Sequence, residues 1–249
     1  MKKRYEPESI TPPPVNLAWT GGWDSTFRLL QLLLHEERRV QPHYIVRPEA
    51  STGQEIDAMN RIRRALFREF PESRKLLMPT HLIDVRAITY SDDLIGECER
   101  IRNSQKVNEQ YPLLACYCSD NDITGMEVCI NSDETVALKA INSSPLFGAL
   151  SSPLTDFRKK STKELADLNG WQPIMHLTVF CRRPKKGRPC GVCGPCYDAI
   201  TMGLGYRLPL SRRLIARGQV PLRRWWRTNK NSMSPKLRSI VLRFMKGRY

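Results

Sequence analysis

The heptapeptide TGGWDST at residues 20–26 combines two glycines with three hydroxyl side chains and one carboxylate. Glycines let a backbone approach a phosphate closely, and the N–H groups that begin a helix bind anions. The hydroxyls of Thr20, Ser25 and Thr26 would add hydrogen-bond donors, and Asp24 can hold a magnesium ion or orient a nucleophile. The heptapeptide therefore indicates a phosphate site. The alternative is a plain strand-to-helix turn in which Asp24 or Ser25 only caps the helix.

A second chemical group consists of four cysteines separated by eight, two and two residues, at Cys181, Cys190, Cys193 and Cys196. Two-residue gaps let neighbouring thiolates converge on one tetrahedral metal ion, and Gly191 and Gly194 relax the backbone around it. Four thiolates favour zinc in a closed, structural site. An iron–sulfur cluster is the main alternative, and disulfides are a third. The remaining cysteines are predicted to be reduced and partly buried; they are Cys98, Cys116, Cys118 and Cys129.

Both groups need a scaffold, and the hydrophobic pattern predicts one. The apolar run at residues 15–19 has strand length, and Phe27, Leu30 and Leu34 follow at helical spacing. Further along, the pattern predicts strands at 42–47 and 80–85 and a strand with its turn at 121–130. It also predicts a helix at 54–70 and a largely helical stretch at 92–118 that is interrupted near Pro112. Strands that alternate with helices indicate a parallel sheet with helices on both faces. Ligands bind such sheets beyond the carboxyl ends of the strands, where the heptapeptide would lie.

Charge divides the chain into two parts. The net charge is +15, and residues 207–249 hold 13 Lys and Arg with no Asp or Glu, whereas residues 1–206 hold 27 basic and 25 acidic residues. A nearly neutral, enzyme-like body is therefore expected to precede a basic C-terminal extension. The N-terminal segment lacks the apolar stretch of a secretory signal, and no apolar run reaches the length of a membrane span. The expectation is a cytoplasmic protein that is not integral to a membrane.

The basic extension has a pattern of its own. Arginines surround Trp225 and Trp226, and an amphipathic helix is predicted after Ser234, with one face formed by Leu237, Ile240, Val241, Phe244 and Met245. This apolar face could pack on the body or on a second copy of the chain. Alternatively, the extension docks a nucleic acid, with arginines on phosphates and tryptophans stacked on bases. An acidic protein partner would use the same charges, and a membrane surface the same amphipathic helix.

Four segments together resemble the 7-cyano-7-deazaguanine synthases, a family of PP-loop ATP pyrophosphatases. TGGWDST is similar to the family's Ser-Gly-Gly-x-Asp-Ser-Thr loop, with Thr20 in place of the first serine. Residues 122–128, DITGMEV, resemble an Ile-Thr-Gly strand end, and residues 152–170 resemble a Pro-Leu segment that places Lys159 at the family's lysine. The Cys-Gly-x-Cys-x-x-Cys core of the cysteine knuckle is the most specific of the four. The resemblance covers residues 15–205.

The chain departs from this family where the substrate base would bind. The family's Tyr-Gly-Gln motif survives only as Gly53-Gln54, and its Pro-Gly-Arg-Asn segment only as Arg102-Asn103. An acidic, tyrosine-containing stretch after Ile-Thr-Gly is replaced by MEVCINSDET at residues 126–135. The resemblance therefore supports ATP binding better than it supports recognition of a deazaguanine.

The resemblance implies a Rossmann-like, adenine nucleotide alpha hydrolase-like fold. The expected organisation is an ATP-binding α/β domain at 1–180, a zinc knuckle at 181–206 and the basic, partly helical extension at 207–249. The implied cofactors are ATP, Mg²⁺ and Zn²⁺, and the implied catalytic residues are Asp24 and Lys159. The implied nucleotide-binding residues are Thr20, Gly21, Gly22, Trp23, Asp24, Ser25, Thr26, Arg102, Asn103 and Gly125. Without the resemblance, Lys159 would be an ordinary surface lysine in a basic run.

The implied reaction is activation of a carboxylate, which in the family belongs to 7-carboxy-7-deazaguanine. The carboxylate attacks the α-phosphorus of ATP and releases pyrophosphate; ammonia then displaces AMP to give an amide, and a second activation dehydrates the amide to a nitrile. Two other function classes stay open. The same chemistry could serve a protein or nucleic-acid acceptor in a modification or defence pathway, which the basic extension favours. A non-catalytic binding module is disfavoured by the intact loop, and a homo-oligomer stays open.

Overall fold

The apolar run before the heptapeptide forms β1 (Val15–Ala18), which pairs in parallel with β2 (Val40–Val46) and β4 (Met126–Glu127). β3 (His81–Asp84) lies outside β2, and β5 (Leu150–Ser151) lies outside β4, so the described strands have the order β3-β2-β1-β4-β5 with every pair parallel.

The computed structural model describes residues 12–89, 95–97, 99–100, 109–132, 138–139, 144–229 and 232–245, excluding the side chains at 159, 219–220, 223–224, 227–228 and 242–245.

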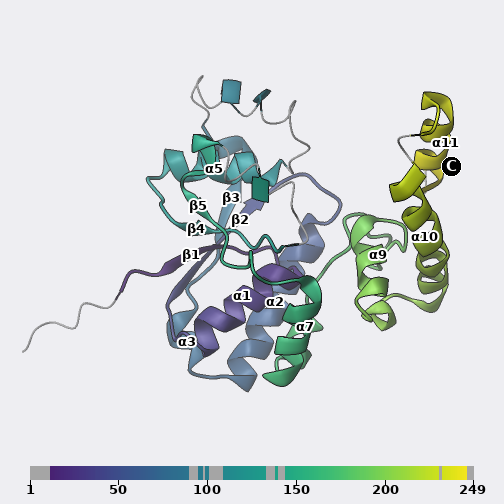
Figure 1. The fold of residues 1–249 in the computed structure, drawn as a ribbon. Coiled ribbons are helices and arrows are strands. Elements are labelled where there is room, and N and C mark those ends of the chain that lie inside the picture. Colours follow the sequence, from purple (N-terminus) through teal and green to yellow (C-terminus); the bar gives the residue numbers. More distant parts are fainter. Residues whose placement is uncertain are drawn as a thin grey trace, which may run out of the picture.

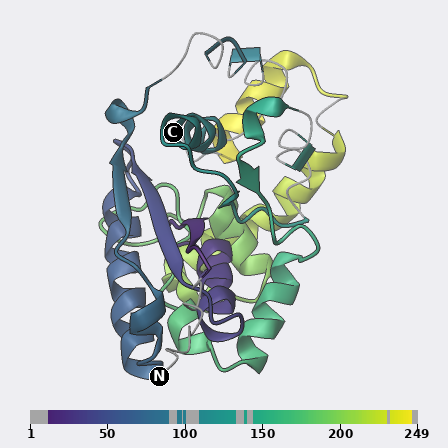
Figure 2. The same ribbon diagram turned by 90° about the vertical axis from the view of Figure 1, so that its left-hand side faces the viewer.

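Helices cover both faces of this sheet. One side carries α1 (Trp23–Leu34), α2 (Thr52–Glu69), α3 (Ser73–Leu76) and α7 (Lys159–Leu168), and the other carries α5 (Gln110–Asp120) (Figure 1). In the turned view, the teal α5 again lies apart from the purple α1 and the blue α2 (Figure 2). Helices between parallel strands supply the crossover connections that such strands require.

The two faces have separate hydrophobic cores, because successive side chains of a strand point to opposite faces. Leu17 packs in a core with residues of α1, α2, α7 and the short α8 (Gln172–Met175). Its neighbour Ala18 packs instead against a core that contains residues of α5, together with Ile45 and Ile83. The prediction of an α/β fold with a parallel sheet flanked by helices is therefore confirmed.

Two predicted elements differ in detail from the structure. In the range 121–130, predicted as a strand with its turn, the strand β4 is only two residues long, and Asp122 and Gly125 before it have positive φ angles of 52° and 67°. Pro112 lies in the first turn of α5, where its missing N–H would have no partner within the helix, so the break predicted near Pro112 corresponds to the start of α5. The N-terminal part of the helix predicted at 92–118 falls largely outside the described residues.

Three helices follow the sheet domain at its side: α9 (Gly194–Thr201), α10 (Leu210–Asn229) and α11 (Pro235–Met245) (Figure 1). α11 confirms the predicted amphipathic helix, whereas the expected helical extension was given no bounds for α10, which contains Pro221. Leu237 is 48% exposed and Ile240 is 56% exposed, so the described part of this chain does not cover that face of α11. None of the described helices combines the length and apolar content needed to cross a bilayer.

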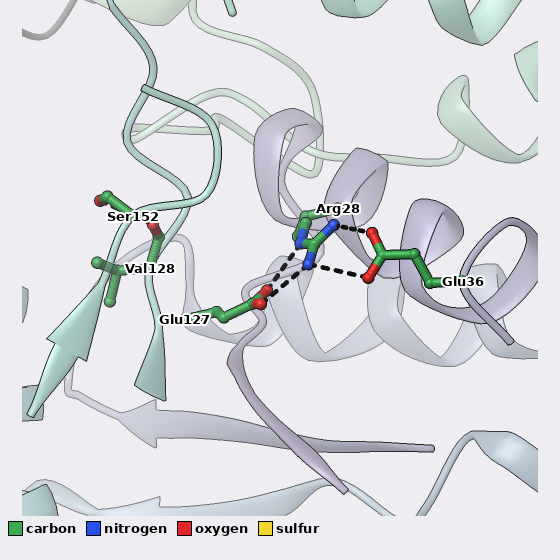
Figure 3. A network of polar contacts seen from close by, with 5 residues as sticks. All are labelled: Arg28, Glu36, Glu127, Val128 and Ser152. Atoms are coloured by element: carbon green, nitrogen blue, oxygen red, sulfur yellow. Dashed lines mark hydrogen bonds and ion pairs between the residues drawn. The ribbon is translucent and has the colours of Figure 1, made fainter. Parts of the chain in front are cut away.

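One ion-pair network ties the first helix to the centre of the sheet (Figure 3). Arg28 of α1 binds the Glu127 carboxylate of β4 with two hydrogen bonds, from Nε at 2.8 Å and from Nη2 at 2.9 Å. The same guanidinium donates to Glu36, just beyond the end of α1. Burial acts to lower the pKa of Arg28, but the hydrogen bonds with Glu127 and Glu36 raise it overall, so the side chain stays charged.

Replacing Arg28 with methionine is expected to lower the free energy of unfolding by about 2–3 kcal/mol, because the largely buried Glu127 would lose its counter-charge. Adding Glu127→Gln should recover part of this loss. The exposed pair of Arg61 with Asp57 offers a control, since Arg61→Met should cost under about 1 kcal/mol. Urea denaturation measures all three, and an Arg28→Met cost no larger than the control would contradict a structural role for the network.

Candidate functional site

The heptapeptide forms a loop at the carboxyl end of β1, between the ends of β2 and β4. The strand order reverses direction at β1, and in parallel sheets the crevice for ligands opens at such a switch point. Residues from this loop line a cavity of about 410 Å³. We call residues 20–25 the glycine loop.

Tight packing holds the glycine loop in place. Gly21 has a positive φ of 66°, and a Cβ atom there would lie 3.1 Å from the Glu55 carbonyl oxygen and 3.2 Å from Met59 of α2. Two hydroxyls of the loop accept hydrogen bonds from its own backbone: Thr20 Oγ1 from the Gly22 N–H at 3.3 Å, and Ser25 Oγ from the Thr20 N–H at 3.4 Å. These contacts within and beneath the loop define its shape.

The start of α1 differs from the simple capped turn that was the alternative interpretation. Gly22 is the N-cap residue and offers no side-chain cap, whereas Asp24 and Ser25 lie within the first turn of α1, so neither of them is the N-cap residue. Both Asp24 and Ser25 line the cavity. The positive end of the helix dipole is thus directed to the cavity wall, where it favours an anion.

Not all of the ten predicted nucleotide-binding residues lie at the cavity. Five of them line the cavity, namely Thr20, Gly22, Trp23, Asp24 and Ser25. Gly21 packs beneath the loop, and Thr26 is fully buried, with its hydroxyl accepting a hydrogen bond from Trp19 Nε1 at 3.1 Å. Gly125 is exposed and precedes β4, at the amino end of the sheet, so it is not brought to the cavity. Arg102 and Asn103 lie outside the described residues.

The predicted catalytic lysine begins a helix near the loop. Lys159 is the first residue of α7, and its side chain lies outside the described part of the structure. One turn further, the Thr162 hydroxyl accepts a hydrogen bond from Trp23 Nε1 at 3.0 Å. This bond fixes the first turns of α7 and α1 next to each other.

Several cavity residues were missed by the sequence analysis. Tyr44 and Tyr111 offer nearly buried aromatic rings, and Arg47, Arg182 and Arg207 offer cations. Arg47 forms an ion pair with Glu49 at 2.9 Å, and the Tyr44 hydroxyl donates to Glu55 at 2.7 Å; burial, aided by Glu55, raises the pKa of Tyr44. No local sequence pattern marks these residues, because they reach the cavity from four separate segments of the chain.

His43 of β2 forms a buried polar link in the wall of the cavity. Its Nε2 lies 3.0 Å from Asn16 Oδ1, and its Nδ1 lies 3.1 Å from the Tyr117 hydroxyl. Nε2 therefore carries the proton and Nδ1 accepts one from the tyrosine. Burial, and secondarily the neighbouring His81, lowers the pKa of His43 to about 4, so the imidazole is neutral near pH 7.

This buried imidazole predicts a loss of stability in mild acid. The unfolded chain binds a proton at His43 near its ordinary pKa of about 6.5, whereas the folded chain does so only near 4, so stability present above pH 6.5 is lost as the pH falls to 4. The loss should be about 3 kcal/mol. His43→Gln should flatten the curve of unfolding free energy against pH. Parallel curves for His43→Gln and the wild type would contradict the assignment.

The four predicted metal ligands come together. Their Sγ atoms all lie within 4.8 Å of one another. The Sγ–Sγ distance is 3.4 Å for Cys193 and Cys196, 3.9 Å for Cys190 and Cys196, and 4.0 Å for Cys181 and Cys193. Four thiolates bound at about 2.3 Å to one tetrahedral ion would lie about 3.8 Å apart. Cys181, Cys190, Cys193 and Cys196 are free thiols rather than disulfides, and the cluster could hold a metal ion such as zinc.

Backbone groups support this cysteine cluster. The Cys190 N–H donates to Cys181 Sγ at 3.2 Å and the Val192 N–H to Cys190 Sγ at 3.5 Å, which favours the thiolate form that binds metals. Interaction with the neighbouring Cys181 thiol holds the pKa of Cys190 below its usual value. Gly191 has a φ of 77°, and a Cβ atom there would lie 2.6 Å from the carbonyl oxygen of Arg212 in α10. The knuckle and α10 are therefore in direct contact.

The hydrophobic core around the cysteine cluster forms part of the wall of the cavity. This core contains Ala199 and Leu204, which line the cavity, and is packed by Trp23 of the glycine loop. Leu208 and Ala216, from the predicted extension, share the same core. A metal bound by the cysteines would therefore stabilise one side of the cavity.

The arrangement suits a ligand with an anionic part and a planar ring. An uncapped helix start, hydroxyls and arginines favour phosphate or carboxylate groups, and buried aromatic rings favour a base. Cavities of roughly 300–1,000 Å³ bind small molecules and cofactors, so about 410 Å³ is in the range for a nucleotide. No protein-family model matches the sequence, and no curated protein matches it.

Proposed function

We propose that this protein is an ATP-dependent adenylating enzyme with the PP-loop ATP pyrophosphatase fold. The observation that carries the proposal is the place of the glycine loop, which follows the central strand at the switch point and lines the cavity with an uncapped helix start. In this proposal the N–H groups of α1 and the hydroxyls of Thr20 and Ser25 bind phosphates, and Asp24 binds Mg²⁺. Lys159, at the start of α7, supplies a further positive charge.

The proposed reaction joins a carboxylate to nitrogen. A carboxylate oxygen of the substrate forms a bond to the α-phosphorus of ATP, and the bond from that phosphorus to the bridging oxygen breaks, with its electron pair leaving on pyrophosphate. Ammonia then attacks the carboxyl carbon, a proton is lost, and AMP leaves with the substrate's oxygen. The cations and N–H groups of the chain would stabilise the charge that develops on pyrophosphate. The proposed substrate is 7-carboxy-7-deazaguanine or a close relative, and a second activation would yield the nitrile.

Zinc is the metal that we propose for the cysteine cluster. Four thiolates close a tetrahedral coordination sphere and leave no position for water, so the role of the ion would be structural. The support is the spacing of the Sγ atoms, which suits one ion rather than an iron–sulfur cluster, whose thiolates bind around several iron atoms.

The test is the identity of the products and the path of one oxygen. The full-length protein is incubated with Mg²⁺, ATP, ammonium and 7-carboxy-7-deazaguanine labelled with ¹⁸O in its carboxylate, and the products are measured by mass spectrometry. Adenylation predicts AMP and pyrophosphate, with one ¹⁸O atom in AMP. ADP with orthophosphate would overturn the proposal, and unlabelled AMP would show hydrolysis by water instead of carboxylate activation.

A second candidate is the same chemistry on a protein or nucleic-acid acceptor. The observation that favours it is the exposed, basic helical segment, in which Trp225 is 46% exposed and no acidic residue occurs after Asp198. Deleting residues 220–249 should then leave AMP formation intact but weaken acceptor binding in a salt-dependent way. Loss of AMP formation on this deletion would show that the segment is needed by the cavity itself, and the macromolecular acceptor would lose its support.

A further inference from the structure

Arg207 reaches the glycine loop from the segment that follows the cysteine cluster. It ends the short 3₁₀ helix Gly205–Arg207, and it lines the cavity. Its guanidinium lies over two aromatic rings, at 5.0 Å from the centroid of Phe180 and 6.0 Å from that of Trp23, the first residue of α1. Aromatic faces attract such a cation and hold it away from water.

Hydrogen bonds connect the same guanidinium to the backbone beside the loop. Arg207 Nη2 donates to the carbonyl of Thr178 and, at 3.3 Å, to that of His176. The next residue along, Val179, donates its N–H to the Gly21 carbonyl at 2.9 Å. The guanidinium is therefore held next to the uncapped start of α1 by a short and continuous set of contacts.

The charge of Arg207 has no counterpart within the described part of the chain. Arg28 binds two carboxylates and Arg47 binds one, whereas none of the ion pairs between described residues includes Arg207. Its Nε and Nη1 donate to no described residue, while both backbone bonds use Nη2. Burial lowers its pKa to about 10, which still leaves the group protonated at neutral pH. A cation held in a partly desolvated wall without a counter-charge is costly, and an anionic ligand would remove that cost.

We propose that Arg207 binds the pyrophosphate part of the nucleotide that the glycine loop binds, an inference that rests on the function proposed above. The remaining donors of its planar guanidinium match phosphate oxygens, and the neighbouring helix start favours the same negative charge. As the bond between the α-phosphorus and the bridging oxygen breaks, the electron pair goes to pyrophosphate, and Arg207 stabilises that charge. A metal bound by the cysteine cluster would then also support the binding of pyrophosphate, because it would stabilise the part of the cavity wall that carries Arg207.

The test measures binding of inorganic pyrophosphate with Mg²⁺ to the full-length protein by isothermal titration calorimetry. Arg207→Met should weaken binding about 10- to 100-fold, the loss expected for a charge-assisted hydrogen bond. Arg207→Lys keeps the charge but not the forked donors, and should give an intermediate affinity. The matched control is Arg183→Met, which removes the same charge from an exposed position outside the cavity and should change affinity less than about twofold.

The outcomes separate this inference from the proposed function. If the wild type binds pyrophosphate and Arg207→Met binds it equally well, the role of Arg207 is refuted and the adenylating function stands. If the wild type binds no pyrophosphate, both are refuted. Weaker binding of the carboxylate substrate alone, with pyrophosphate binding unchanged, would assign Arg207 to the other ligand and also refute the inference. Should Arg207→Met fail to fold, as judged by circular dichroism, an unchanged affinity of Arg207→Lys would refute it instead.

Discussion

Replacing Asp24 with asparagine is expected to lower the rate of AMP formation at least about a hundred-fold, while the melting temperature changes little. Asp24 is the second residue of α1 and lines the cavity beside the glycines of the loop. Asparagine has nearly the same size but no charge, so it would remove the proposed Mg²⁺ ligand without opening a gap. AMP formation at several Mg²⁺ concentrations, together with thermal unfolding, measures both effects.

A suitable control changes an equivalent carboxylate elsewhere. Asp120 is exposed at the end of α5 and does not line the cavity, so Asp120→Asn should keep the wild-type rate. Because the variants carry the same charge change, a difference between them reflects position. An Asp24→Asn variant that retained most of its activity would remove Asp24 from the proposed metal site.

The second large effect is expected at the cysteine cluster. Cys193→Ser should reduce bound zinc from one ion per chain to a small fraction and destabilise the segment that contains α9, by several kcal/mol, because the binding free energy of a structural metal is also folding free energy. Elemental analysis gives the metal content, and limited proteolysis followed by mass spectrometry locates the loosened segment. Cleavage should concentrate after Cys181.

Cys116→Ser serves as the control for this experiment. Cys116 is a buried residue of α5, outside the cysteine cluster, so its substitution should leave one metal ion per chain even if it lowers overall stability. Full metal content in Cys193→Ser would contradict the assigned ligands. Iron together with acid-labile sulfide in the wild-type protein would show that the cysteines hold an iron–sulfur cluster and not zinc.

The parts of this fold that were predictable are those whose signal is local. The glycine loop lies between an apolar run of strand length and an apolar run with helical spacing, which predicts a strand, a turn and a helix. The two-residue gaps between Cys190, Cys193 and Cys196 likewise predict that their thiolates converge. β4 and β5 are two residues long, which is too short for any alternation to be visible, and the proline within α10 hides a helix of 20 residues.

The candidate site shows the same division. Asp24 was identified because it lies within the loop motif, whereas Arg207 lies far along the chain and reaches the loop through tertiary contacts with Trp23, Phe180 and the backbone at 176–178. Gly125 was predicted to bind the nucleotide because its motif resembles the end of a strand. In the structure its positive φ places it in a turn, and β4 begins only after it. A sequence motif specifies residue types and their spacing. Whether those residues lie at the amino or the carboxyl end of the sheet depends on whether they precede or follow the strand.

The close contact between Gly191 and the Arg212 backbone has a consequence for how the chain is made. On the ribosome the four cysteines emerge before α10, whose early turns dock on the knuckle, because Arg212 of α10 contacts Gly191 and Ala216 of α10 packs in the core around the cysteines. If a metal ion closes the knuckle, as proposed above, the last helices should stay undocked in newly made chains until that ion is bound. Metal supply would then set how quickly a nascent chain matures, and chains made during metal starvation would present their basic segment to the proteases of the cell in an open form.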